Sequence, residues 1–126
     1  KSRSRTFCDP YYMKIDEFKF GRISVDGKYF DDDIILMPPE LKCPWWRKEG
    51  HTLFAADMVE ILRYRPEIIV VGTGVAGHMD VPAGTITEMK SAGMEVEVLL
   101  TEGACARFNE LKRADRKVAA ALHITC

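Results

Sequence analysis

The sequence lacks several features that would indicate a functional class directly. No apolar run reaches the roughly 18 residues that a membrane-spanning helix needs, so we expect no membrane segment. The net charge is only −1, without the basic excess that a nucleic-acid-binding surface requires, so we expect no nucleic-acid partner. The four cysteines form no C-x-x-C pair and are too sparse for a disulfide scaffold, which favours a reducing, cytoplasmic compartment.

The length and composition are those of one ordinary globular domain. The chain has 126 residues, of which 47% are hydrophobic and 29% are charged. Residues 1–12 differ from the rest because they are rich in basic residues and serine and show no apolar periodicity. We interpret them as a disordered arm or as residues added for expression, with the remnant of an organelle transit segment as the alternative. Residues 13–126 are expected to form a single α/β domain.

A glycine-rich segment matches the dinucleotide-binding fingerprint but lacks its structural context. Residues 72–77 read Gly-Thr-Gly-Val-Ala-Gly and follow the apolar run 68–71, which predicts a buried strand. In a dinucleotide site the third glycine lies in the first turn of a helix whose N-terminus holds the pyrophosphate. Here Pro82 indicates a helix that begins about five residues too late. The glycines therefore predict a turn at the carboxyl end of a strand, and we predict no cofactor.

The two halves of the chain differ in periodicity. Residues 15–37 alternate like strands, Asp26-Gly27 is a strong hairpin signal, and Pro38-Pro39 ends the last strand. From residue 55 onward, helical and strand patterns alternate, which predicts parallel strands joined by right-handed crossovers. The expected elements are a helix from 55 that stops before Pro66, strands at 68–71, 95–100 and 117–124, a helix at 82–92, and a helix at 102–113 with Thr101 as its N-cap.

Two regions are candidates for ligand binding. The connection over residues 38–52 carries paired tryptophans beside Arg47 and His51, which can form a stacking or anion-binding site or can plug one edge of the core. The carboxyl ends of parallel strands are the other place where open α/β sheets bind ligands. The candidate ligand-binding residues are Trp46, Arg47, His51, Gly72, Thr73, Gly74, Thr101 and Asn109.

Other chemically suggestive residues have simpler interpretations. The run Asp31–Asp33 can bind a divalent metal, but we expect a solvated turn. Cys105, near a helix N-terminus, can act as a nucleophile with His123, but its apolar neighbours favour a buried core thiol. His123 and Cys126 can share a metal only if the strand ends between them, so we expect structural roles. Asn109 is expected to hydrogen-bond a neighbouring segment. We predict no catalytic residue and no metal site.

Several motifs together resemble one small family. They are the strand leading into Gly72-Thr73-Gly74, Val81-Pro82, Gly93 before Glu95-Val96-Glu97-Val98, Phe108-Asn109-Glu110-Leu111, and the terminal His123-Ile124-Thr125-Cys126. The chain is similar to the family that contains mitochondrial complex I assembly factor 3 and a cytosolic adipogenesis-associated protein, with archaeal and bacterial members. The resemblance implies a three-layer α/β fold: a central mixed, mostly parallel sheet flanked by helices, with an N-terminal antiparallel β-hairpin. It carries over no catalytic residue.

Two functional hypotheses follow. The first is a non-enzymatic binding, assembly or regulatory factor that recognises a protein partner through the loops 38–52 and 72–82. The alternative is a small-molecule-binding protein or enzyme whose pocket lies at the carboxyl ends of the parallel strands, where Arg47 or His51 meets an anionic ligand. The chain is expected to be a monomer or a homodimer, since an exposed edge strand can pair two copies.

Overall fold

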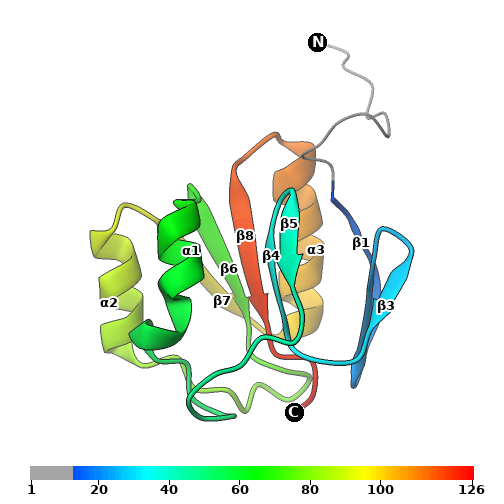
Figure 1. Ribbon diagram of the computed structural model, residues 1–126, viewed down its shortest axis with the longest axis horizontal. Helices are drawn as coiled ribbons and strands as arrows, with labels where there is room; N and C mark the ends of the chain where they lie inside the picture. Colours follow the sequence, from blue (N-terminus) through cyan, green and yellow to red (C-terminus); the bar gives the residue numbers. More distant parts are fainter. Residues whose placement is uncertain (1–12) are drawn as a thin grey trace.

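The computed structural model describes residues 13–126, and the expectations for residues 1–12 lie outside them (Figure 1). The described elements are β1 (Ile15–Lys19), β2 (Arg22–Val25), β3 (Lys28–Phe30), β4 (Ile34–Met37), β5 (Glu40–Lys42), the 3₁₀ turn η1 (Ala55–Met58), α1 (Val59–Tyr64), β6 (Ile68–Gly72), α2 (Ala83–Ser91), β7 (Glu95–Leu99), α3 (Thr101–Arg113) and β8 (Val118–Leu122). No helix within 13–126 has the length and apolarity needed to cross a membrane.

The central layer is a five-stranded sheet in the order β5-β4-β8-β6-β7. β6 lies parallel to β7 and β8, whereas β4 runs antiparallel to β8 and β5. Figure 1 shows α1 and α2 over one face of this sheet and α3 over the other. The predicted α/β fold with a central mixed sheet flanked by helices is therefore confirmed.

The sheet has an apolar core on each face because successive side chains of a strand point to opposite sides. In β6, Ile68 and Val70 pack on the side of α3, while Ile69 and Val71 pack on the side of α1 and α2. The helix over the first face buries the residues that its spacing predicted: Ala104, Cys105, Phe108 and Leu111. Such burial on both faces explains why β6 and β8 read as uninterrupted apolar runs.

The N-terminal strands form a separate antiparallel sheet, β1-β2-β3, that packs against α3. The expected hairpin connects β2 to β3, and both Asp26 (φ 50°) and Gly27 (φ 83°) adopt the positive φ that a tight hairpin turn needs. β1 adds a third strand. Asn109 on α3 binds it, because its side chain accepts from Ile15 N at 2.9 Å and donates to Ile15 O at 2.8 Å.

Two local expectations were wrong. Residues 40–42 form the strand β5 beside β4, where the sequence predicted an irregular connection, because a tight turn at Pro38-Pro39 folds the chain back at once. Thr101 is the first residue of α3, whose N-cap is Leu100. The Thr101 hydroxyl binds two other chain segments and therefore does not cap its own helix.

Candidate functional site

The candidate site begins where β4 starts and β8 ends. These strands are antiparallel with Ile34 opposite Leu122, so the residue before β4 and the residue after β8 emerge side by side. They are Asp33 and His123. The His123 Nδ1 atom lies 2.9 Å from Asp33 Oδ2, and the backbone N–H of Ile124 donates to Asp33 Oδ1 at 2.8 Å. The strand register therefore creates this pair.

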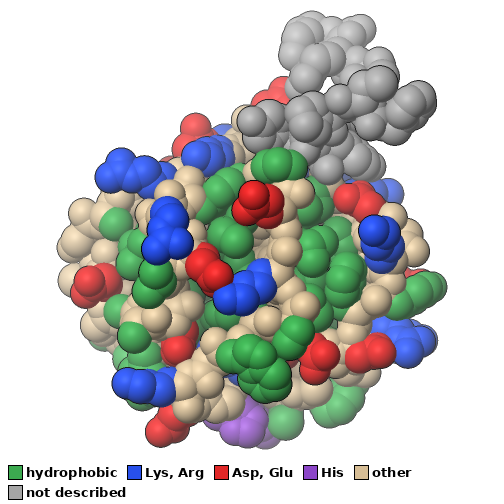
Figure 2. Space-filling view, viewed as in Figure 1, with side chains coloured by type: hydrophobic (Ala, Val, Ile, Leu, Met, Phe, Trp, Pro, Cys, Tyr) green, Lys and Arg blue, Asp and Glu red, His purple; other side chains and the backbone are tan. Residues whose placement is uncertain are grey.

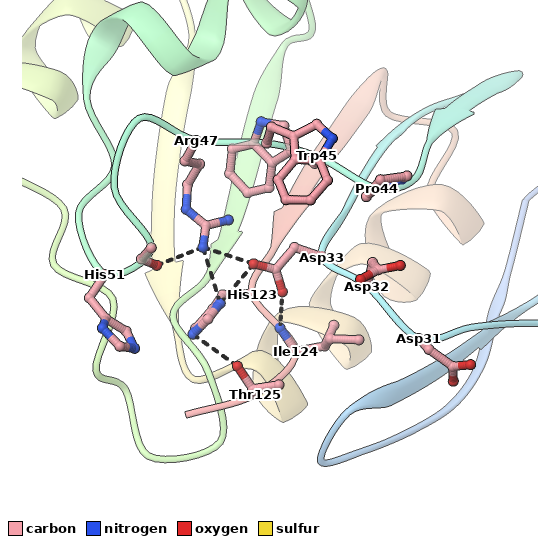
Figure 3. A pocket seen from close by; sticks show the side chains of 12 residues that line it. Asp31, Asp32, Asp33, Pro44, Trp45, Arg47, His51, His123, Ile124 and Thr125 are labelled. Carbon is pink, nitrogen blue, oxygen red and sulfur yellow. Dashed lines mark hydrogen bonds and ion pairs between the residues drawn. The ribbon is translucent and has the colours of Figure 1, made fainter.

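Arg47 completes a buried charged cluster (Figure 3). Its side chain is only 4% exposed, and Nη2 lies 2.8 Å from Asp33 Oδ2. The same nitrogen donates to Gly50 O at 2.6 Å, and the guanidinium carbon lies 4.8 Å from the centre of the Trp45 ring. Among the described residues, Arg47 Nε and Nη1 are buried without a hydrogen-bond partner. Arg47 is thus held by an ion pair, a carbonyl and an aromatic face.

The cluster keeps its carboxylate ionised. Burial raises the pKa of Asp33, but hydrogen bonds from His123, Ile124 N–H and Arg47, together with the charge of His123, outweigh burial and bring the pKa below its ordinary value. A carboxylate oxygen can only accept, so His123 Nδ1 is the donor in that contact. The other ring nitrogen, Nε2, lies 3.4 Å from Thr125 Oγ1, and Arg47 Nη2 lies 3.3 Å from Nδ1.

A cavity of about 410 Å³ opens beside the cluster. The two tryptophans next to it differ in role: Trp45 is 3% exposed and belongs to the core, whereas Trp46 is 77% exposed. The plug interpretation therefore holds for Trp45 but not for Trp46, and a binding role for Trp46 stays a prediction. The lining residues are Asp31, Asp32, Asp33, Pro44, Trp45, Trp46, Arg47, Gly50, His51, His123, Ile124 and Thr125.

Of the eight residues proposed from the sequence, Trp46, Arg47 and His51 line this cavity. The other five do not. Asn109 binds β1, as described above, and Gly72, Thr73, Gly74 and Thr101 are buried in a junction with the C-terminal segment. The carboxyl end of β6 is therefore filled by the chain itself.

The junction explains the glycine pattern. The Thr101 hydroxyl accepts from Gly74 N at 2.7 Å and donates to His123 O at 2.6 Å. A Cβ at Gly74 would collide with the backbone carbonyl of Cys126, and its φ of 110° is one that other residues rarely adopt. The next helix, α2, starts only at Ala83, so the segment is a turn and not a dinucleotide fingerprint.

The sequence did not identify Asp33 as a site residue, and it suggested only a nucleophilic or metal-binding role for His123. Asp33 was interpreted as part of a solvated turn, which describes the exposed Asp31 and Asp32 but not Asp33. His123 was considered as a partner of Cys105. Burial raises the pKa of the Cys105 thiol to about 12, with a further contribution from Glu102, so this thiol is a core group at neutral pH. The signal that could have paired Asp33 with His123 is the strand register, which one sequence does not give.

Comparison with known proteins places the chain in a family. The NADH dehydrogenase (ubiquinone) 1 alpha subcomplex assembly factor 3 of Danio rerio is 29% identical over 102 residues, which are 79% of this chain and only 57% of that relative. A solved protein described as MT938 is 28% identical, with a TM-score of 0.77 over 91% of this chain and 100% of that one. The conserved hypothetical protein PH1505 of Pyrococcus horikoshii OT3 is 25% identical, with a TM-score of 0.72 over 90% of this chain and 99% of that one. A family model described as "Protein of unknown function (DUF498/DUF598)" matches residues 15–123, and the chain therefore belongs to this family.

Proposed function

We propose that the protein is a non-enzymatic binding factor with an assembly or regulatory role, and that it recognises a protein partner with the surface around Trp46. The observation that carries this proposal is the 77% exposure of Trp46 at the edge of a formed cavity. A large aromatic side chain exposed to water costs solvation free energy, and tryptophan is the residue type most enriched among the strongest contributors to protein interfaces.

The residues on either side of Trp46 support this role because their contacts hold the loop in place. The neighbouring Trp45 is anchored in the core, and its Nε1 donates to Asp57 O at 3.4 Å. On the other side, Arg47 is fixed by Asp33, and Lys48 N donates to Asp57 Oδ1 at 3.0 Å. A loop held before binding loses less conformational entropy on binding, so more of the contact energy becomes affinity.

The comparisons support only the part of the proposal that concerns an assembly role, and they do not bear on the surface around Trp46. The relative from Danio rerio is named as an assembly factor, but this chain spans just over half of its length. A partner for this chain is therefore inferred from its own surface, with the relative's name as secondary support. The three free thiols of the described residues, Cys43, Cys105 and Cys126, support the cytoplasmic location that belongs to the same proposal.

The proposal is tested by comparing two variants. The tagged protein is purified under native conditions from the cells that express it, alongside Trp46→Ala and Val75→Ala. Val75 is a matched control, since it is 45% exposed but lies in the glycine-rich segment. We expect a protein that is retained by the wild type and by Val75→Ala and reduced at least about tenfold in Trp46→Ala. Equal recovery with all three proteins contradicts the proposal.

The second candidate function is binding of a small anion in the cavity. It is supported by Arg47, which lines the cavity and has two buried nitrogens without partners among the described residues. Phosphate, acetate and citrate are titrated separately into isotopically labelled protein while the Arg47 Nε–H resonance is followed. A saturable shift with one of these probes supports this function, and the absence of saturation with all three removes it.

A further inference from the structure

The charged groups that line the cavity are unequal in sign. The lining contains three carboxylates, those of Asp31, Asp32 and Asp33, and one guanidinium, that of Arg47. Figure 2 shows acidic side chains beside hydrophobic ones in the lower part of the face, where the segment that joins β3 to β4 lies in Figure 1. Burial raises the pKa of the nearby Cys43 thiol, and the charges of the same three carboxylates raise it further. A ligand of this cavity therefore meets an excess of negative charge.

The guanidinium of the lining is already balanced, and one carboxylate is not. Arg47 pairs with Asp33 at 2.8 Å. Asp31 is balanced from outside the cavity, because Arg22 Nε donates to its Oδ1 at 2.9 Å. Asp32 is exposed, and within residues 13–126 its carboxylate has no ion pair or hydrogen bond. Figure 3 shows Asp31 and Asp32 on the side of the cavity away from Arg47. Asp32 is therefore the carboxylate with which a cationic ligand can pair.

An exposed indole borders the same cavity as Asp32. The face of an indole attracts a cation that lies within about 6 Å of the ring centre, and tryptophan does so more strongly than the other aromatic residues. Trp45 already has such a cation, because the guanidinium carbon of Arg47 is 4.8 Å from its ring centre. Trp46 is 77% exposed, and no cation of the described residues lies over its ring. The cavity thus presents an open indole together with an unpaired carboxylate.

We propose that the protein partner inserts a basic side chain, arginine or lysine, into this cavity, with the cationic group between the Trp46 ring and the Asp32 carboxylate. This inference rests on the proposed function, because it names the chemistry of the partner that the surface around Trp46 binds. Exposed ion pairs contribute little affinity individually. The two contacts therefore select the sign of the charge that enters the cavity, while the rest of the interface supplies most of the affinity.

The unpartnered nitrogens of Arg47 provide an independent observation. Nε and Nη1 are buried and have no hydrogen-bond partner among the described residues, so one wall of the cavity has donors that lack an acceptor. A buried donor without a partner costs free energy that an acceptor on a ligand recovers. A main-chain carbonyl oxygen accepts without carrying a charge, whereas an anion adds to the negative excess of the lining. A basic peptide segment therefore supplies both the cation and the acceptor.

The test uses blocked peptides of the form acetyl-Gly-Gly-X-Gly-Gly-amide, in which X is arginine, glutamate or citrulline, a neutral analogue of arginine. Each peptide is titrated into the isotopically labelled full chain while the indole Nε1–H resonances are followed. Trp45, whose Nε1 donates to Asp57 O, reports whether the core is unchanged. We expect a saturable shift of the Trp46 resonance, with an affinity for the arginine peptide at least about fivefold higher than for the citrulline peptide and lower at high salt.

Two matched variants locate the charge that is recognised. Asp32→Asn is expected to lower the affinity for the arginine peptide at least about threefold and to leave that for the citrulline peptide unchanged. Glu49→Gln is the control, because Glu49 is also exposed and lies in the same connection as Trp46 but does not line the cavity. Its effect should stay below about twofold. Equal affinities for arginine and citrulline, a preference for glutamate, no saturable binding, or no effect of Asp32→Asn overturns the proposal.

This inference and the proposed function fail in different ways. Recovery of a partner with the wild type and its loss in Trp46→Ala test the proposed function without any basic peptide. A partner lost in Trp46→Ala, together with peptides that bind equally, overturns only the inference that the partner inserts a basic side chain. Equal recovery with the wild type and Trp46→Ala overturns the proposed function and this inference with it.

Discussion

Two regions meet where the parallel strands β6 and β8 end, and they differ in how well their sequences indicated what they do. The glycine-rich segment 72–77 carries a recognisable motif, yet Gly72 and Gly74 are buried, and Gly74 packs against the backbone of Cys126. The tryptophan loop 44–51 matches no motif, yet it borders a cavity and presents an exposed indole. The glycine pattern therefore reflects how closely two backbones approach, and the loop is where we propose that another molecule binds.

The two regions also differ in the interactions that hold them. The glycine segment depends on steric fit and on neutral hydrogen bonds to the Thr101 hydroxyl. The loop depends on a buried ion pair between Arg47 and Asp33. Substitutions in the glycine segment should lower the free energy of unfolding. In the tryptophan loop, substitution of Arg47 should lower stability, whereas substitution of Trp46 should reduce only the proposed binding.

The largest effect is expected in the glycine segment. Gly74→Ala places a Cβ against the Cys126 carbonyl in a left-handed conformation, and both strain and overpacking oppose folding. We expect a loss of about 3 to 5 kcal/mol in the free energy of unfolding, measured by urea denaturation. Gly84→Ala is the control: a Cβ there meets nothing within 4 Å on α2, so stability should rise by up to about 1 kcal/mol. Similar effects of the two substitutions would contradict the account of the junction.

Arg47→Met is expected to be next in size. It keeps the apolar contact with Trp45 but leaves the Asp33 carboxylate without its cation. We expect a loss of about 3 kcal/mol, the lower end for a broken buried pair, because Asp33 retains 17% exposure and the His123 contact. The double variant with Asp33→Asn should lose less than the sum of the two single losses. Additive losses would show that the two groups are not coupled.

Thr101→Val tests the hydroxyl that joins the junction to the site. The isosteric change leaves Gly74 N–H and His123 O without their partner inside the core. We expect the free energy of unfolding to fall by about 1 to 3 kcal/mol. If Thr101 capped α3 instead, the loss would be confined to that helix and hydrogen exchange at Gly74 would not change.

Acid should weaken the loop more than the glycine segment. The pKa of Asp33 is lower in the folded protein than its ordinary value of about 3.8, so the folded state binds the proton less readily than the unfolded state. The resulting stabilisation is present above the unfolded pKa and is lost as pH falls through the folded pKa. In Asp33→Asn the decline of stability below about pH 4 should be shallower. Parallel pH profiles for the two proteins would contradict the lowered pKa.

Trp46→Ala should have the smallest effect on stability. The side chain is exposed, so we expect a change within about 0.5 kcal/mol in the free energy of unfolding. A loss as large as that of Arg47→Met would mean that the indole is part of the fold, and the case for a binding role would fail.

Much of the fold could be predicted from the sequence because local signals were strong. Asp26-Gly27 specified the β2–β3 hairpin, and the spacing of Ala104, Phe108 and Leu111 specified the buried face of α3. β5 was missed because its three residues carry too short an alternation to separate from a loop. The three-stranded form of the small sheet depends on contacts of β1 with α3 that no local pattern contains.

The site was only partly predictable. Trp46, Arg47 and His51 were chosen because unusual residue types gather in one loop, and the structure places all three on the cavity. The chain distance between Asp33 and His123 is large, so their meeting depends on strand register and on nothing local. Thr101 and Gly74 were predicted as ligand-binding residues because the ends of parallel strands are usual ligand sites, but here the C-terminal segment occupies that end.

The central claim is that a protein partner binds at the tryptophan loop and not at the glycine segment. The most direct measurement is site-specific photo-crosslinking in living cells, with the reactive amino acid placed at position 46 in one protein and at position 75 in another. Both positions are exposed, so either can react with a neighbour. The account predicts a discrete crosslinked product from position 46 and none from position 75. A product from position 75 alone, or none from position 46, would contradict it.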